Sequence, residues 1–181
     1  HTLSLHDALR SKGGFAAQVG AVFGGYVSIT DCLDFGNGSF RISATLNCPT
    51  YFRASGNNAT ITQTNTALDI FSCATAYQWQ IEGINFIGGR YQLYLENANT
   101  DVTRWRIDNC TFSLSSSFAI MTWPTGGATS HLSANLTVSK CAFYRPKQVL
   151  FNYCDSAIVE DCWVFVTKEN FSAGKIGRAH V

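Results

Sequence analysis

This sequence of 181 residues has few charged side chains, no long hydrophobic run and no clustered metal ligands. Charged residues make up 14%, with 13 basic and 12 acidic side chains, so no basic stripe is available for nucleic acid. No apolar run is long enough to cross a membrane. The seven cysteines form no C-x-x-C pair, which argues against a zinc site or a dithiol redox motif. We therefore expect one domain without a metal, a cofactor, a nucleic-acid partner or a membrane span.

The sequence does contain a short phrase that recurs four times, at intervals of 26, 31 and 21 residues. Its four copies are Ile81–Phe86 (IEGINF), Ile107–Phe112 (IDNCTF), Val138–Phe143 (VSKCAF) and Val159–Val164 (VEDCWV). Recurrence at twenty to fifty residues is typical of a solenoid. The phrase is short and rich in β-branched and aromatic residues, which favours strands over helices.

Each copy of the phrase breaks the alternation of a flat strand, because its apolar positions are the first, fourth and sixth. Such a break requires a bend. The bend falls at Gly, Asn or Asp in three copies, and these residues adopt the left-handed conformation readily. Lys140 is the exception and is expected to be strained there. Stacking the copies predicts an aliphatic ladder at the first position, a mainly cysteine ladder at the fourth and a mainly phenylalanine ladder at the sixth.

An apolar run precedes each copy and predicts a further strand in each coil. The runs are Leu68–Cys73, Tyr91–Leu95, Phe118–Trp123 and Gln148–Asn152. The predicted fold class is all-β, a parallel β-helix of the single-stranded β-solenoid type with about four to six coils.

Two further segments, Gly38–Leu46 (GSFRISATL) and Asn58–Thr62 (NATIT), lead towards these coils. With the corner phrases they resemble the right-handed parallel β-helix proteins of the pectate-lyase-like superfamily, in the group of rhamnogalacturonases and phage tailspikes. The resemblance covers about Phe15 to Thr167, and it lacks the usual Asp-Asp-Thr opening and capping helix of that group. It implies a right-handed β-helix that degrades or binds an acidic polysaccharide along an outer groove.

The two ends differ from the interior and show no β pattern. Residues 1–12 and part of 168–181 resemble translated sequencing-adapter read-through, and the alternative is a short natural helix at each end. We expect residues 13–67 to form N-terminal strands that lead into the β-helix and residues 68–167 to form its repeated coils. On this interpretation the chain is a fragment, and removal of the basic residues at its ends turns the net charge slightly negative.

The cysteines are interpreted first as core residues. Cys110, Cys141 and Cys162 share one position of the phrase, where a small thiol packs as a hydrophobic group. Disulfides between adjacent coils are the alternative, since stacked strands lie about 4.8 Å apart.

The resemblance places a groove along the strand that precedes each corner phrase. The outward residues there are predicted to be Tyr94, Glu96, Met121, Trp123 and Asn152, with Asp155 just beyond. Tyr94 and Trp123 are candidates for stacking on sugar rings, with Asn152 beside them; the alternative is that exposed aromatic residues only cover the coil edge.

Glu96 and Asp155 are the best pair of carboxyl groups for glycoside hydrolysis. They are expected about two coils and roughly 10 Å apart, which suits an inverting geometry and not a retaining one. The alternative is that Glu96 ends a strand and Asp155 forms a turn. A polysaccharide lyase would instead use basic residues, and Arg145 and Lys147 are the substrate-binding candidates, with Arg104 and Arg106 as further cations.

Three functions therefore remain open. The chain is a fragment of a polysaccharide lyase or inverting glycoside hydrolase, a non-catalytic carbohydrate-binding or adhesin segment, or a structural spacer. The first two imply a polysaccharide partner and an extracellular location, or one on a cell or virion surface. Uncapped strand edges predict a homo-oligomer, a trimer if the protein is spike-like.

Overall fold

The computed structural model describes residues 2–4, 32–97, 103–124 and 132–165. These residues form strands and no helix, and none of them could therefore cross a membrane as a helix. The strands are β1 (Thr2–Ser4), β2 (Cys32–Asp34), β3 (Ser39–Ile42), β4 (Leu46–Asn47), β5 (Tyr51–Gln63), β6 (Phe71–Cys73), β7 (Gln78–Gly88), β8 (Leu93–Asn97), β9 (Thr103–Asp108), β10 (Thr111–Ser113), β11 (Phe118–Pro124), β12 (Leu132–Ser139), β13 (Ala142–Tyr144), β14 (Gln148–Phe151), β15 (Cys154–Glu160) and β16 (Trp163–Phe165). The first strand, β1, pairs in parallel with β2, whereas the sequence indicated no β pattern at this end. Residues 5–12 and 168–181 lie outside the described part, so the interpretation of the two ends as read-through stays a prediction.

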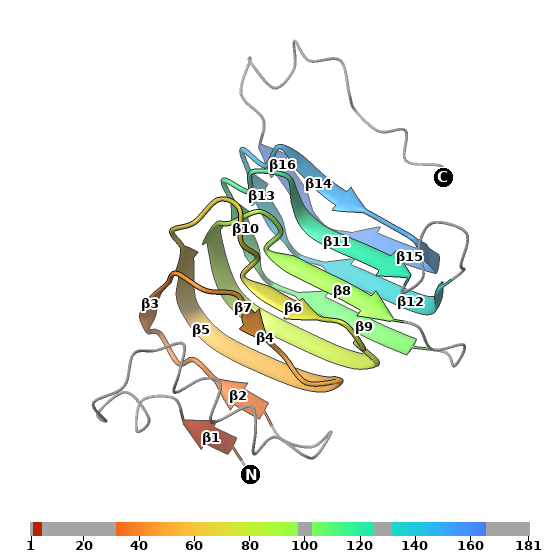
Figure 1. Ribbon diagram of the computed structural model, residues 1–181, viewed down its shortest axis with the longest axis horizontal. Coiled ribbons are helices and arrows are strands. Elements are labelled where there is room, and N and C mark those ends of the chain that lie inside the picture. The colour runs from red at the N-terminus through yellow and green to blue at the C-terminus, as the bar shows by residue number, and fades with distance from the viewer. Residues whose placement is uncertain (1, 5–31, 98–102, 125–131, 166–181) are drawn as a thin grey trace.

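The strands form two parallel sheets, which confirms the all-β class and the parallel pairing. In the longer sheet, of eleven strands, the order β1-β2-β5-β7-β10-β13-β16 is joined by β3 on β5, by β9 between β7 and β12, and by β15 on β12. The shorter sheet has the order β4-β6-β8-β11-β14. Figure 1 shows the shorter sheet in front of the longer one, each with its strands stacked in the order of the sequence.

The recurring phrase stacks in register, as its spacing predicts. The first positions pair as Ile81 with Ile107, Ile107 with Val138, and Val138 with Val159. The sixth positions pair as Phe86 with Phe112, Phe112 with Phe143, and Phe143 with Val164. The three phenylalanine rings stack nearly parallel, with centroids 5.2 Å and 5.1 Å apart. The three phenylalanines therefore form a continuous buried column, which ends at the exposed Val164.

The bend inside each phrase has the left-handed backbone that the sequence predicts. The angle φ is +67° at Gly83, +50° at Asn109, +53° at Lys140 and +52° at Asp161. The amide of Asn109 donates to the carbonyl of Ser139 at 3.0 Å. The amide of Lys140 donates likewise to the carbonyl of Glu160 at 3.1 Å, so these two corners are each bonded to the next copy of the phrase. Lys140 adopts the left-handed conformation in spite of its β-carbon.

A fifth copy of the phrase was not predicted. Ala54 pairs with Ile81 and Ile61 pairs with Phe86, but the register shifts between Ser55 and Ala59. This copy therefore contains two extra residues around its corner. The columns formed by the first and sixth positions of the phrase therefore continue through Ala54 and Ile61 into the N-terminal part of the stack.

The runs that precede the phrase form the shorter sheet, in agreement with the predicted further strand. Leu93, Leu95 and Ile120 are fully buried on its inner face. Phe71 of β6 contacts Phe52 of β5 with ring centroids 5.4 Å apart, so the two sheets share one core.

The cysteines of the phrase are core thiols. The Sγ atoms of Cys110, Cys141 and Cys162 donate to the carbonyl oxygens two residues earlier, each at 3.2 Å. The neighbouring Cys110 thiol and, next, burial raise the pKa of Cys141. The thiol therefore stays protonated and packs as a small hydrophobic group.

Candidate functional site

The outer face of the shorter sheet carries the residues that the sequence assigns to a groove. In β8, Leu93 and Leu95 are buried, whereas the intervening Tyr94 and the following Glu96 are half-buried. The parallel register places Met121 beside Tyr94 and Trp123 beside Glu96. Met121 is buried there, whereas the sequence predicted an outward, exposed position. Period-2 alternation thus puts an aromatic ring and a carboxylate on adjacent strands of one face.

Tyr94 and Glu96 form a hydrogen bond on this face. The phenol of Tyr94 donates to Oε2 of Glu96 at 3.3 Å. Partial burial and, next, the negative charge of Glu96 raise the pKa of Tyr94 to about 12. The phenol is therefore neutral over the physiological range and holds one oxygen of the carboxylate in place.

More aromatic rings surround this pair. The Tyr91 ring lies 5.5 Å from Tyr94 and 6.2 Å from Phe118, measured between centroids. The Arg90 guanidinium lies over the Tyr91 ring at 4.5 Å, and Asp69 holds it by two hydrogen bonds of 2.9 Å. The rings are thus part of a fixed surface.

The far end of this surface holds a second aromatic pair. The Trp123 ring contacts the Tyr153 ring edge to face, with centroids 4.9 Å apart. Asn152 is exposed next to it, and its Oδ1 atom accepts from Thr122 Oγ1 at 3.4 Å. We call the residues Tyr91, Tyr94, Glu96, Phe118, Trp123, Asn152 and Tyr153 the aromatic face.

The structure does not bring the other predicted site residues to the aromatic face. Arg145 and Lys147 are exposed before the start of β14, where Arg145 forms a second left-handed corner with φ of +49°. Phe118 pairs with Gln148 there, so five residues of β11, about 16 Å, separate this end from Trp123. The backbone of Asp155 belongs to β15 of the longer sheet, and its side chain lies outside the described part. The pairing of Glu96 with Asp155 stays a prediction.

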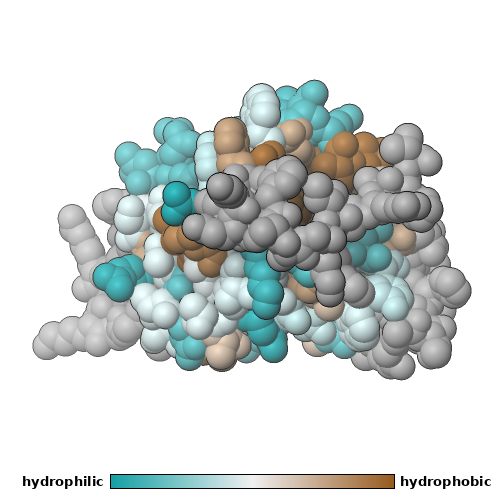
Figure 2. Space-filling view, turned by 90° about the horizontal axis from the view of Figure 1, so that it is seen from above, coloured by the Kyte–Doolittle hydropathy of each residue, from teal (hydrophilic) through white to brown (hydrophobic). Residues whose placement is uncertain are grey.

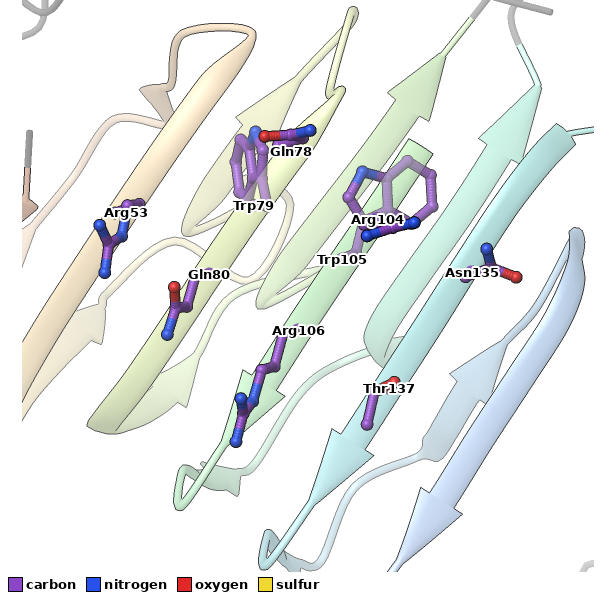
Figure 3. Close-up of a pocket in the computed structure, with 9 residues that line it drawn as sticks. All are labelled: Arg53, Gln78, Trp79, Gln80, Arg104, Trp105, Arg106, Asn135 and Thr137. Carbon is purple, nitrogen blue, oxygen red and sulfur yellow. The ribbon is translucent and has the colours of Figure 1, made fainter. Parts of the chain in front are cut away.

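Sequence reasoning missed a hollow on the outer face of the longer sheet, with a volume of about 530 Å³. We call it the cationic hollow. Its lining residues are Arg53, Gln78, Trp79, Gln80, Arg104, Trp105, Arg106, Asn135 and Thr137 (Figure 3). The sequence does indicate that Arg104 and Arg106 point outward, because they flank the apolar Trp105. It does not show which residues of other strands lie beside them, and only the strand register gives that.

The polar residues of the cationic hollow form two rows across the strands. In one row Arg53 pairs with Gln80, Gln80 with Arg106, and Arg106 with Thr137. In the other, Gln78 pairs with Arg104 and Arg104 with Asn135. Three guanidinium groups therefore lie on one surface, whose described lining residues include no carboxylate.

Neither face has the donor set of a metal site. Among the residues that the structure describes, no three His, Cys, Asp or Glu side chains are grouped so that they could hold a metal ion. No protein-family model, curated protein or solved structure matches this chain.

Proposed function

We propose that this protein is a right-handed parallel β-helix, similar in fold to the pectate-lyase-like superfamily, that binds an acidic polysaccharide on its aromatic face. The observation that carries the proposal is the register of β8 and β11, which sets Trp123 beside Glu96 and Met121 beside Tyr94. The stacked, in-register corner phrases support the β-helix.

Carbohydrate recognition combines flat apolar groups with hydrogen-bonding groups at their edges. The aromatic face offers both. Tyr94 and Trp123 provide rings for the apolar face of a sugar, while the Glu96 carboxylate and the Asn152 amide lie next to them for its hydroxyl groups. Arg145 and Lys147, at the other end of the same sheet, would pair with carboxylates of a long acidic chain.

A binding experiment tests this function. Trp123→Ala removes one stacking ring and should weaken binding to polygalacturonate about tenfold, which corresponds to about 1.4 kcal/mol. Tyr144→Ala is the matched control, because Tyr144 is an exposed aromatic residue of β13, on the longer sheet. Isothermal titration calorimetry measures both. Equal affinities of the parent and Trp123→Ala would contradict the proposal.

Cleavage is the alternative use of the same face, with Glu96 and Asp155 as an inverting acid and base. A panel of acidic polysaccharides tests it through the release of reducing ends or of unsaturated products. Loss of hydrolysis in both Glu96→Gln and Asp155→Asn would support the pair. Cleavage that survives both substitutions would exclude it, and binding without cleavage leaves the non-catalytic function.

Self-association is proposed for the C-terminal end of the stack. Hydrophobic side chains of the last strands are half exposed there, with Trp163 at 61% and Val164 at 51%. Figure 2, seen from the side on which β14 and β16 lie in Figure 1, shows hydrophobic surface among polar residues. An exposed parallel edge of this kind favours homo-oligomers. A monodisperse monomer in size-exclusion chromatography would contradict this.

A polysaccharide ligand also implies an extracellular location or one on a cell or virion surface.

A further inference from the structure

We propose that the cationic hollow is a second binding site, which takes an anionic oligosaccharide through its carboxylate or sulfate groups. The hollow lies on the longer sheet, whereas the aromatic face belongs to the shorter one. The proposal therefore goes beyond the function of the aromatic face and does not depend on it.

The spacing of the three guanidinium groups suits a ligand with several charges. Arg53 and Arg106 belong to one row and are two strands apart, or about 10 Å. Arg104 and Arg106 are two residues apart on β9, or about 7 Å, and both point outward. Guanidinium groups bind carboxylate and sulfate oxygens with two parallel hydrogen bonds. The hollow can therefore hold successive anionic groups of one extended chain.

The charge of Arg106 is available to a ligand. Its Nη2 atom lies 4.0 Å from Oδ2 of Asp108, and its side chain is 60% exposed. Asp108 also accepts a shorter hydrogen bond of 2.7 Å from Ser139 Oγ. The contact between Arg106 and Asp108 is at the outer limit of an ion pair, and the Asp108 side chain is only 14% exposed. The exposed Arg106 guanidinium can therefore reach a ligand, beside the mostly buried carboxylate of Asp108.

The uncharged lining residues favour a glycan over other polyanions. Gln78, Gln80, Asn135 and Thr137 present amide and hydroxyl groups between and beside the arginines, and these suit sugar hydroxyl groups (Figure 3). The two tryptophans of the hollow are only 2% and 1% exposed. They offer no ring on which a base of single-stranded nucleic acid could stack.

The experiment compares the parent with Arg104→Gln/Arg106→Gln, and the matched control is Arg41→Gln, an exposed arginine of β3 outside the hollow. The probes are a sulfated heparin-type decasaccharide, an oligogalacturonate, a neutral glucan oligosaccharide and single-stranded DNA. Calorimetry at three salt concentrations gives the affinity and its salt dependence. The Trp123→Ala variant is measured with the same probes to separate the two faces.

We expect one or both anionic oligosaccharides to bind the parent, with an affinity that falls as salt rises. The double variant should bind at least tenfold more weakly and with a shallower salt dependence, while Arg41→Gln keeps this salt-dependent component for both anionic probes and Trp123→Ala keeps it for the sulfated one. An unchanged affinity of the double variant would overturn the proposal. So would the absence of salt-dependent binding to either anionic probe, or tighter binding of single-stranded DNA than of both.

Discussion

The corner at Gly83 gives the sharpest test of the stacked architecture. Its φ is +67°, and a β-carbon added there would overlap the carbonyl oxygen of Gly56 in the neighbouring strand. The left-handed conformation costs a residue with a β-carbon about 1–2 kcal/mol. Relief of the overlap adds about 1–3 kcal/mol, as for other overpacked sites. Gly83→Ala should therefore lower the free energy of unfolding by about 2–5 kcal/mol.

Gly36→Ala is the matched control for this prediction. Gly36 has a similar φ of +57°, but nothing lies within 4 Å of the position of an added β-carbon. Only the conformational term applies, so this variant should lose about 1–2 kcal/mol. Urea denaturation, followed through the fluorescence of the buried Trp79 and Trp105, measures both variants. Equal losses in the two variants would refute the close approach of the strands at Gly83.

Three further predictions concern the ladder, the corners and the aromatic face. Phe112→Ala should cost about 3–5 kcal/mol, because the ring is fully buried between two stacked rings; a loss below 1 kcal/mol in urea denaturation would argue against the column. Lys140→Asn should raise the free energy of unfolding by about 0.5–1 kcal/mol, since asparagine tolerates the left-handed corner, and a lower urea midpoint would contradict this. Tyr94 should ionise near pH 12 in an ultraviolet titration, and Glu96→Gln should lower this pKa, because the carboxylate charge no longer opposes ionisation. Because the pKa of Tyr94 is higher in the folded protein than in the unfolded chain, its neutral phenol stabilises the fold below pH 10, and this contribution is lost as the pH rises towards 12. An ordinary tyrosine pKa for Tyr94 would refute the Tyr94–Glu96 contact.

Much of the fold could be predicted because one six-residue phrase encodes both a column and a corner. Its apolar positions give the columns at Ile107 and Phe112, and its polar pair gives the left-handed bend at Asn109. The same logic failed at Ala54–Ile61, where two extra residues hide the spacing. It also missed the second corners at Leu114 and Arg145, whose φ values are +59° and +49°, because neither residue type favours that conformation.

The sequence also predicts the residues of one candidate site but not those of the other. Tyr94, Glu96 and Trp123 could be assigned to one face because each follows a buried neighbour within a predicted strand. The cationic hollow could not, since Arg53 and Arg106 are far apart in sequence and only the register of three strands places them in one row. Local alternation shows which way a side chain points, whereas pairing decides what lies next to it.

Tryptophan fluorescence tests most directly the proposed binding of an acidic polysaccharide to the aromatic face. The chain has four tryptophans, of which Trp79 and Trp105 are buried. In a Trp163→Phe background, Trp123 is the only remaining tryptophan that is not buried. Titration with an oligogalacturonate should then change the emission in a saturable way, and Trp123→Phe in the same background should abolish the change. An emission spectrum that is unaffected by the ligand, or a change that persists without Trp123, would contradict the account.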